Sequence, residues 1–235
     1  MKRSTISPPI VMLTVANLVP LAGVIFIGWD AAFIVLLYWS ENLVLGLYNI
    51  LKIAILRVEH PLGHLGKLLA IPFFSLHFGG FCAVHGFFLL VLFKIGGDQG
   101  DFFPKESWPG HLIFLQMLVS VIKTLWQNSP PGMEWPVLGL LISHGISFIS
   151  NYLCKGEYTR LTIGKLMNQP YKRIVLLHIT IIAGGIPIMI LGSPTPLLCI
   201  LVILKVGMDI FFHIREHAPQ LEGKIGKEFR SELAG

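Results

Sequence analysis

Long apolar runs separated by short polar turns dominate the chain. A run of about 20 residues crosses the ~30 Å hydrocarbon core of a bilayer, because an α-helix rises ~1.5 Å per residue. Runs of that length cover residues 9 to 28, 31 to 56, 68 to 95, 135 to 154, 173 to 192 and 195 to 214. The pattern predicts an all-α, polytopic transmembrane helix bundle with six spans, in which residues 1–235 form a single integral membrane domain.

A seventh apolar segment, Gly110 to Trp126, is only marginally long enough to cross a membrane. It carries Gln116 and Lys123 and is bracketed by a Trp-Pro pair and a Pro-Pro pair. We expect this segment to be an interfacial or re-entrant helix on the outer side. A bundle of seven spans is the alternative.

The distribution of basic residues favours six spans. Lys and Arg gather at the start of the chain, in two loops and in the tail, at Lys2 and Arg3, at Lys52, Arg57 and Lys67, at Lys155, Arg160, Lys165, Lys172 and Arg173, and at Arg215, Lys224, Lys227 and Arg230. Cytoplasmic loops of membrane proteins are rich in these residues. All four stretches share one side only if residues 110 to 126 do not cross, so both termini are predicted to be cytoplasmic.

Composition agrees with a membrane protein. The chain is 54% hydrophobic and has a mean hydropathy of +0.71. Charged residues make up 13% of it, which is about half the fraction in an average soluble domain. The net charge of +5 comes from Lys and Arg spread over loops between spans. This arrangement argues against nucleic acid as a partner and indicates the lipid bilayer instead. The expected substrate is a lipid or a small molecule.

Titratable side chains inside the apolar runs carry the clue to function. Seven of them fall within predicted spans: Glu41, His77, His85, His144, His178, Asp209 and His213. Each ionisable group near the middle of a bilayer costs roughly 2 to 3 kcal/mol when it is unpaired. These side chains are therefore expected to contact one another, or a shared metal ion, inside the helix bundle.

Depth and spacing select a candidate metal site. Residue counts from the predicted cytoplasmic ends of the spans place four side chains at a similar depth in the bilayer: His77, His144, His178 and Asp209. Asp209 and His213 also lie on the same face of one helix, one turn apart. The predicted metal ligands are His77, His144, His178, Asp209 and His213. Glu41 and His85 are predicted to lie farther from the cytoplasmic side, where they could form a second layer. Glu41 and Asp209 are the candidate catalytic acid or base residues, and His85, Asn151 and His217 are supporting residues.

Imidazole and carboxylate ligands without nearby cysteine suit zinc, iron or copper. We favour zinc, which would lower the pKa of a bound water so that Glu41 or Asp209 could remove its proton for attack on a lipid-borne amide or ester. Non-haem iron or, less favoured, haem would make the protein an oxidoreductase. An ion or proton transporter, or a purely hydrogen-bonded structural network, would use the same residues.

Basic side chains near the span ends receive simpler interpretations. Lys52, Arg57, Arg173 and Arg215 are expected to extend towards lipid headgroups. Lys205 lies four residues before Asp209 on the same predicted helix, where the two side chains could form an ion pair.

Five motifs together resemble those of an uncharacterised family of bacterial multi-pass membrane proteins: YWSEN (38 to 42), HFGGFCAVHG (77 to 86), SHGISFISNY (143 to 152), PYKRIVLLH (170 to 178) and GMDIFFHIREH (207 to 217). The resemblance spans most of the chain and implies a location in the bacterial inner membrane, but no activity. The chain is also loosely similar to the ceramidase and adiponectin-receptor superfamily of intramembrane zinc hydrolases. That likeness implies zinc ligands at His77, His213 and His217.

Overall fold

The structure is a computed structural model that describes residues 18–96, 108–129 and 131–207. Every regular element in these residues is helical, and no strand occurs among them. This confirms the prediction of an all-α fold. The candidate residues Asp209, His213 and His217 lie outside the described part of the chain.

Four helical stretches are long and apolar enough to cross a membrane, and they match four of the predicted spans. The first two are helix α2, Ala31–Ile55, and helix α3, Pro61–Phe93. The third is α5, Glu134–Ser147, which continues as the π-helix η4, Phe148–Cys154. The fourth combines α6, Ile163–Asn168, with α7, Tyr171–Leu191.

Shorter helices occupy the remaining predicted segments. Apolar helices Leu18–Ile27, which includes the π-helix η1, Gly23–Ile27, and Thr195–Gly207 cover the described parts of spans 9 to 28 and 195 to 214. Helix α4, Ile113–Asn128, follows the 3₁₀ turn η3, Gly110–Leu112. Its 16 residues reach only about 24 Å, short of the ~30 Å core. The interfacial or re-entrant character of α4 and the total of six spans stay predictions.

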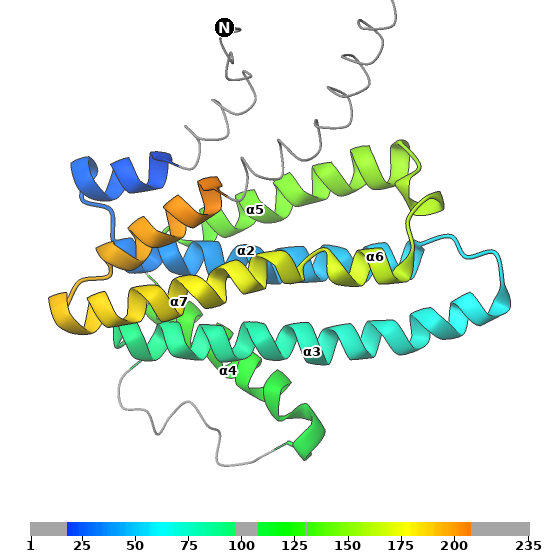
Figure 1. Cartoon of the computed structure of the whole chain (residues 1–235), viewed down its shortest axis with the longest axis horizontal. Helices are drawn as coiled ribbons and strands as arrows, with labels where there is room; N and C mark the ends of the chain where they lie inside the picture. Colours follow the sequence, from blue (N-terminus) through cyan, green and yellow to red (C-terminus); the bar gives the residue numbers. More distant parts are fainter. Residues whose placement is uncertain (1–17, 97–107, 130, 208–235) are drawn as a thin grey trace, which may run out of the picture.

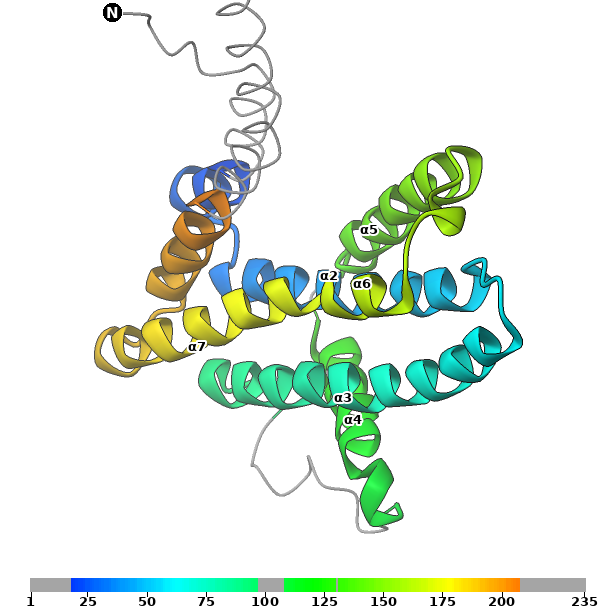
Figure 2. The same cartoon turned by 45° about the vertical axis from the view of Figure 1, so that its right-hand side comes forward.

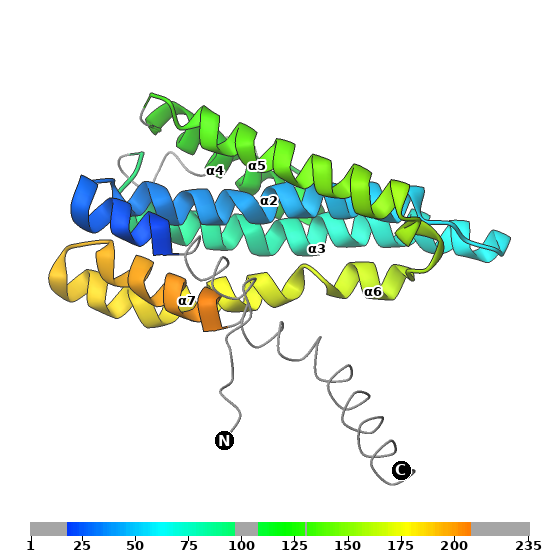
Figure 3. The same cartoon turned by 90° about the horizontal axis from the view of Figure 1, so that it is seen from above.

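Helices α2, α3 and α7 run side by side along the longest axis of the molecule (Figure 1). Helix α5 packs on α2, whereas α4 packs on α3 and crosses it obliquely, as Figure 2 shows. Seen from above, the helix Thr195–Gly207 folds back along α7 (Figure 3). The centre of the bundle therefore lies between α2, α3 and α7.

The main core joins these helices through large buried side chains. Trp39 on α2 is 1% exposed, and its indole nitrogen Nε1 donates to the carbonyl oxygen of Cys82 on α3 at 2.9 Å. Leu177 and Leu197 extend the same cluster to α7 and to the helix that follows it. Many apolar side chains on the outside remain exposed, as a lipid-facing surface requires: Phe26, Leu68, Trp126, Ile146, Met189 and Ile190 are examples.

The basic loops meet at one end of the bundle. Beyond α2, the backbone N–H of Arg57 donates to the carbonyl oxygen of Tyr158, in the 3₁₀ turn η5, Glu157–Thr159, at 2.8 Å. The Lys67 ammonium of α3 donates to the carbonyl oxygen of Ala54 at 3.0 Å. The described parts of two predicted basic stretches therefore lie on the same side of the molecule.

A close approach at Gly86 offers a test of this packing. A Cβ added at Gly86 would lie 2.5 Å from Cζ2 of Trp39 and 2.7 Å from Cγ1 of Val121, where α2, α3 and α4 meet. We expect Gly86→Ala to lower the free energy of unfolding by about 1 to 3 kcal/mol, because an overpacked core must shift. Thermal unfolding of the purified protein in detergent measures this change.

The matched control is Gly139→Ala on α5, where the added Cβ meets no described atom within 4 Å. Ala is a better helix former than Gly, so this variant should be as stable as the parent or slightly more stable. Equal melting temperatures for Gly86→Ala and the parent would contradict the packing of the three helices.

Candidate functional site

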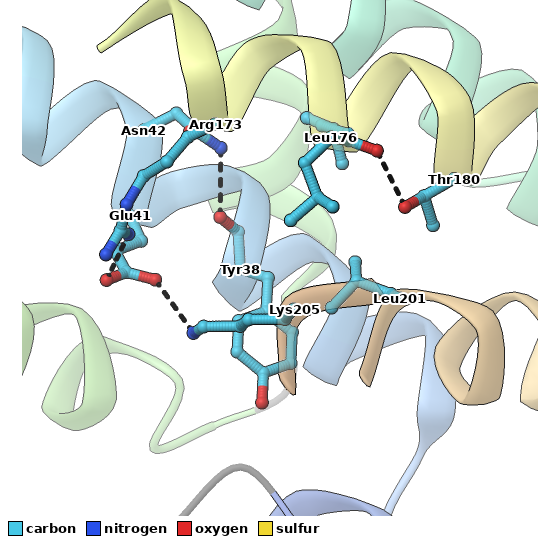
Figure 4. A pocket seen from close by; sticks show the side chains of 9 residues that line it. Tyr38, Glu41, Asn42, Arg173, Leu176, Thr180, Leu201 and Lys205 are labelled. Atoms are coloured by element: carbon cyan, nitrogen blue, oxygen red, sulfur yellow. Dashed lines mark hydrogen bonds and ion pairs between the residues drawn. The ribbon is translucent and has the colours of Figure 1, made fainter. Parts of the chain in front are cut away.

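An ion-pair cluster centred on Glu41 lies inside the bundle. The side chain of Glu41, halfway along α2, is only 13% exposed. Nη1 of Arg173 on α7 donates to its Oε1 at 2.6 Å, and Nζ of Lys205 lies 3.5 Å from its Oε2. Figure 4 shows the carboxylate between the two cations. One carboxylate thus ties α2 to α7 and to the helix Thr195–Gly207.

His144 completes this cluster from α5. Its Nε2 lies 3.5 Å from Oε1 of Glu41, within ion-pair distance when the imidazole is protonated. Two guanidinium or ammonium groups and an imidazole therefore surround a single carboxylate. Among the described residues, this cluster has two cations, Arg173 and Lys205, beside one carboxylate, whereas a metal cation would need the opposite balance.

A small cavity of about 40 Å³ borders the cluster and has Glu41, Arg173 and Lys205 among its lining residues. Nζ of Lys205 lies 4.3 Å from the centre of the Tyr38 ring, which also lines this cavity. The other polar groups here bond to nearby backbone: Thr180 Oγ1 donates to the carbonyl oxygen of Leu176, and Asn42 Nδ2 to that of Tyr38 (Figure 4). The space suits a few water molecules.

A larger polar cavity of about 260 Å³ also has Arg173 in its wall. It lies between α2, α5 and the start of α7, and no acidic residue lines it among the described residues: its walls are Leu45, Tyr48, Asn49, Lys52, His144, Ser147, Phe148, Gln169, Pro170 and Arg173. Asn49 is 4% exposed, and its Nδ2 has no hydrogen-bond partner among the described residues. This "donor cavity" presents the side chains of Lys52 and Arg173 and a buried donor that lacks an acceptor among the described residues.

Two of the predicted metal ligands, His77 and His178, lie apart from Glu41 and line one cavity with His85. Nδ1 of His85 on α3 lies 2.6 Å from the carbonyl oxygen of Phe81, and its Nε2 lies 2.9 Å from Nδ1 of His178 on α7. Nδ1 of His77, two turns before His85, lies 2.7 Å from the hydroxyl oxygen of Tyr171. All three imidazoles line one apolar cavity of about 260 Å³, which we call the "histidine cavity".

The structure therefore separates the sequence-predicted site residues. Glu41 contacts His144, whereas His85 contacts His178 and not Glu41, so the expected second layer is replaced by a different pairing. Asn151 Nδ2 donates to Ser147 Oγ, and Lys155 donates to Asn151. No group of three His, Cys, Asp or Glu side chains that could hold a metal occurs in the described part of the chain.

Depth counting misplaced these residues because the helices begin earlier than the apolar runs. Helix α3 starts at Pro61 rather than at 68, and α6 extends the fourth span back to Ile163 rather than 173. Each imidazole on these helices therefore lies farther from its helix end than the count assumed.

Sequence reasoning also missed four members of the site. Arg173 was expected to extend to headgroups but instead binds Glu41, and Lys205 pairs with Glu41. Lys52 was expected to extend to headgroups and Asn49 only to orient side chains near Glu41, yet both line the donor cavity. The available signal was Lys205 itself, because a lysine ten residues into a predicted span requires a buried anion and Glu41 is the acidic residue in the other spans.

The chain was compared with protein families, curated proteins and solved structures. No curated protein and no solved structure matches the chain. A family model covers residues 1–225, which is nearly the whole sequence. The chain therefore belongs to a family of unknown function (DUF6498).

Proposed function

We propose that this protein binds a small anion inside its helix bundle and carries it across the membrane. The observation that supports this most is the donor cavity, whose walls offer Lys52, Arg173 and the unpartnered Nδ2 of Asn49 but no carboxylate from the described residues. A buried amide donor without an acceptor costs about 1 to 3 kcal/mol. A carboxylate or phosphate group would remove that cost. It would compete with the acidic side chains that already face the two cations, because Glu41 contacts Arg173 and Glu157 attracts Lys52.

Arg173 links this cavity to the Glu41 cluster. The same guanidinium lines both cavities and holds Glu41 at 2.6 Å. An anion in the donor cavity would compete with Glu41 for Arg173 and so weaken the contact between α2 and α7. Ligand binding would then shift the packing of these two helices, which is the kind of differential contact that a carrier needs.

We further propose that the basic end of the bundle faces the cytoplasm of a bacterial cell, with the protein in the inner membrane. The described stretches with Lys52, Arg57 and Lys67 and with Lys155 and Arg160 lie at this end. Enrichment of Lys and Arg in cytoplasmic loops supports this orientation. The donor cavity would then open towards cytoplasmic anions.

The metal-dependent hydrolase, with zinc favoured over iron, copper or haem, stays a prediction of the sequence. Arg173 and Lys205 beside Glu41 disfavour a dication at that carboxylate, because like charges at such distances repel strongly in a membrane interior. The histidine cavity retains His77 and His178 as ligand-type side chains. Anion transport is the function that the described contacts support better.

Binding of inorganic phosphate and of succinate to protein in phosphatidylcholine nanodiscs tests the anion site. Asn49→Leu and Lys52→Met should each weaken binding by about tenfold, because a hydrogen bond to a charged ligand contributes about 1.5 to 3 kcal/mol. The matched control is Lys165→Met, an exposed cation on α6 that lies outside the cavity walls. Calorimetry measures the three affinities.

Two further experiments distinguish a lipid headgroup from a free anion as the ligand. Competition by phosphatidylglycerol in the nanodisc would assign the site to a lipid headgroup, whereas phosphate uptake into liposomes would support a carrier. Absence of binding by the parent protein, or equal affinities for Lys52→Met and Lys165→Met, would contradict the anion site.

Cys154 reports the orientation. It is exposed at the end of η4, beside Lys155, whereas Cys82 is buried. In a Cys82→Ser, Cys199→Ser variant, a membrane-impermeant maleimide should label inside-out vesicles and leave right-side-out vesicles unlabelled, because the basic end faces the cytoplasm. Labelling of right-side-out vesicles alone would reverse the proposed orientation.

A further inference from the structure

The histidine cavity opens on the lipid-facing side of the bundle between α3, α4 and α7. Its walls are mostly apolar, and they include Phe81 from α3 and Phe114 from α4. Phe81 is 39% exposed, and His77 and His178 are exposed as well. A ligand would therefore enter from the bilayer, and it would have to be uncharged and largely apolar.

Hydrogen bonds fix the polarity of the His85–His178 pair when both rings are neutral. The Phe81 carbonyl can only accept, so Nδ1 of His85 carries its proton and Nε2 of His85 is the acceptor. Nδ1 of His178 must then donate to that nitrogen. The remaining nitrogen, Nε2 of His178, is left with a lone pair. His178 thus offers an acceptor to the cavity it lines.

His77 has the opposite polarity. The phenolic proton of Tyr171 needs an acceptor, and Nδ1 of His77, 2.7 Å from the hydroxyl oxygen, is the acceptor that the described structure provides. With a neutral ring, Nε2 of His77 then carries the proton. The cavity therefore combines one imidazole acceptor, one imidazole donor and aromatic walls.

We propose that the histidine cavity binds the head ring of a lipid-soluble quinol. One ring hydroxyl donates to Nε2 of His178, and the other ring oxygen accepts from Nε2 of His77, while the ring lies against Phe81 and Phe114. A planar ring that partitions into the bilayer satisfies both histidines without bringing a charge into the membrane. A volume of about 260 Å³ accommodates such a ring. This site is separate from the donor cavity and does not depend on anion binding.

The reduced ring can donate to His178, whereas the oxidised ring, which has only carbonyl oxygens, cannot. Parent protein in nanodiscs should therefore bind short-chain ubiquinol, kept reduced under argon, about three- to tenfold more tightly than the matching ubiquinone. His178→Ala should abolish that difference. His64→Ala, an exposed histidine on α3 outside the cavity, should keep it. Equilibrium dialysis with quantification of bound ring compound measures these affinities.

A second variant keeps the test valid if His178→Ala folds poorly. Val84→Phe fills the cavity and leaves all three imidazoles in place, so it should lose both forms of the ligand. Equal affinities of the parent for ubiquinol and ubiquinone, or an unchanged preference in His178→Ala, would overturn the proposal. Zinc or iron bound to the parent at one ion per chain and lost in His178→Ala would also overturn it and return these histidines to a metal centre.

Discussion

A carboxylate inside a helix bundle must be neutralised, and the Glu41–Arg173 ion pair is the interaction on which the rest of this structure depends. Removing one partner of a fully buried pair costs about 3 to 5 kcal/mol, because the remaining charge has no compensation. The cost here should be smaller, because the Arg173 side chain is 35% exposed. The 2.6 Å contact joins α2 to α7, and Lys205 and His144 bring the helix Thr195–Gly207 and α5 to the same point. One acidic side chain thus gathers four helices.

In the described part of the chain, two cations face the single carboxylate of Glu41, and this arrangement gives the site its chemistry. Arg173 faces a carboxylate on one side and the donor cavity on the other, so the same guanidinium can stabilise the bundle or bind a ligand. Asn49 adds a buried amide that lacks an acceptor in the described structure. The histidine cavity has a different character, because its imidazoles bond to each other, to a backbone carbonyl and to a phenol without any carboxylate. Charged and uncharged ligands therefore have separate places in one small bundle.

The sequence predicted the helices better than it predicted their contacts. Apolar runs located α2, and α5 together with η4, to within a residue or so, because helix ends there coincide with changes in hydropathy. The cost of unpaired charge correctly indicated that Glu41 and the histidines would find partners, as Glu41 with His144 and His85 with His178 show. Which partners they find depends on helix rotation and on where each helix begins, neither of which hydropathy determines. Arg173 was misinterpreted for this reason: its position near a span end fits a headgroup contact as well as an ion pair.

A double-mutant cycle between Glu41 and Arg173 tests the central claim most directly. The free energy of unfolding in detergent would be measured for the parent, for Glu41→Gln, for Arg173→Gln and for the double variant. If Glu41 and Arg173 neutralise each other, each single substitution should clearly lower the free energy of unfolding. The double substitution should lower it by less than the sum of the two, with a coupling energy of about 1 to 3 kcal/mol. Strictly additive effects would contradict the account and would show that the two side chains are stabilised independently.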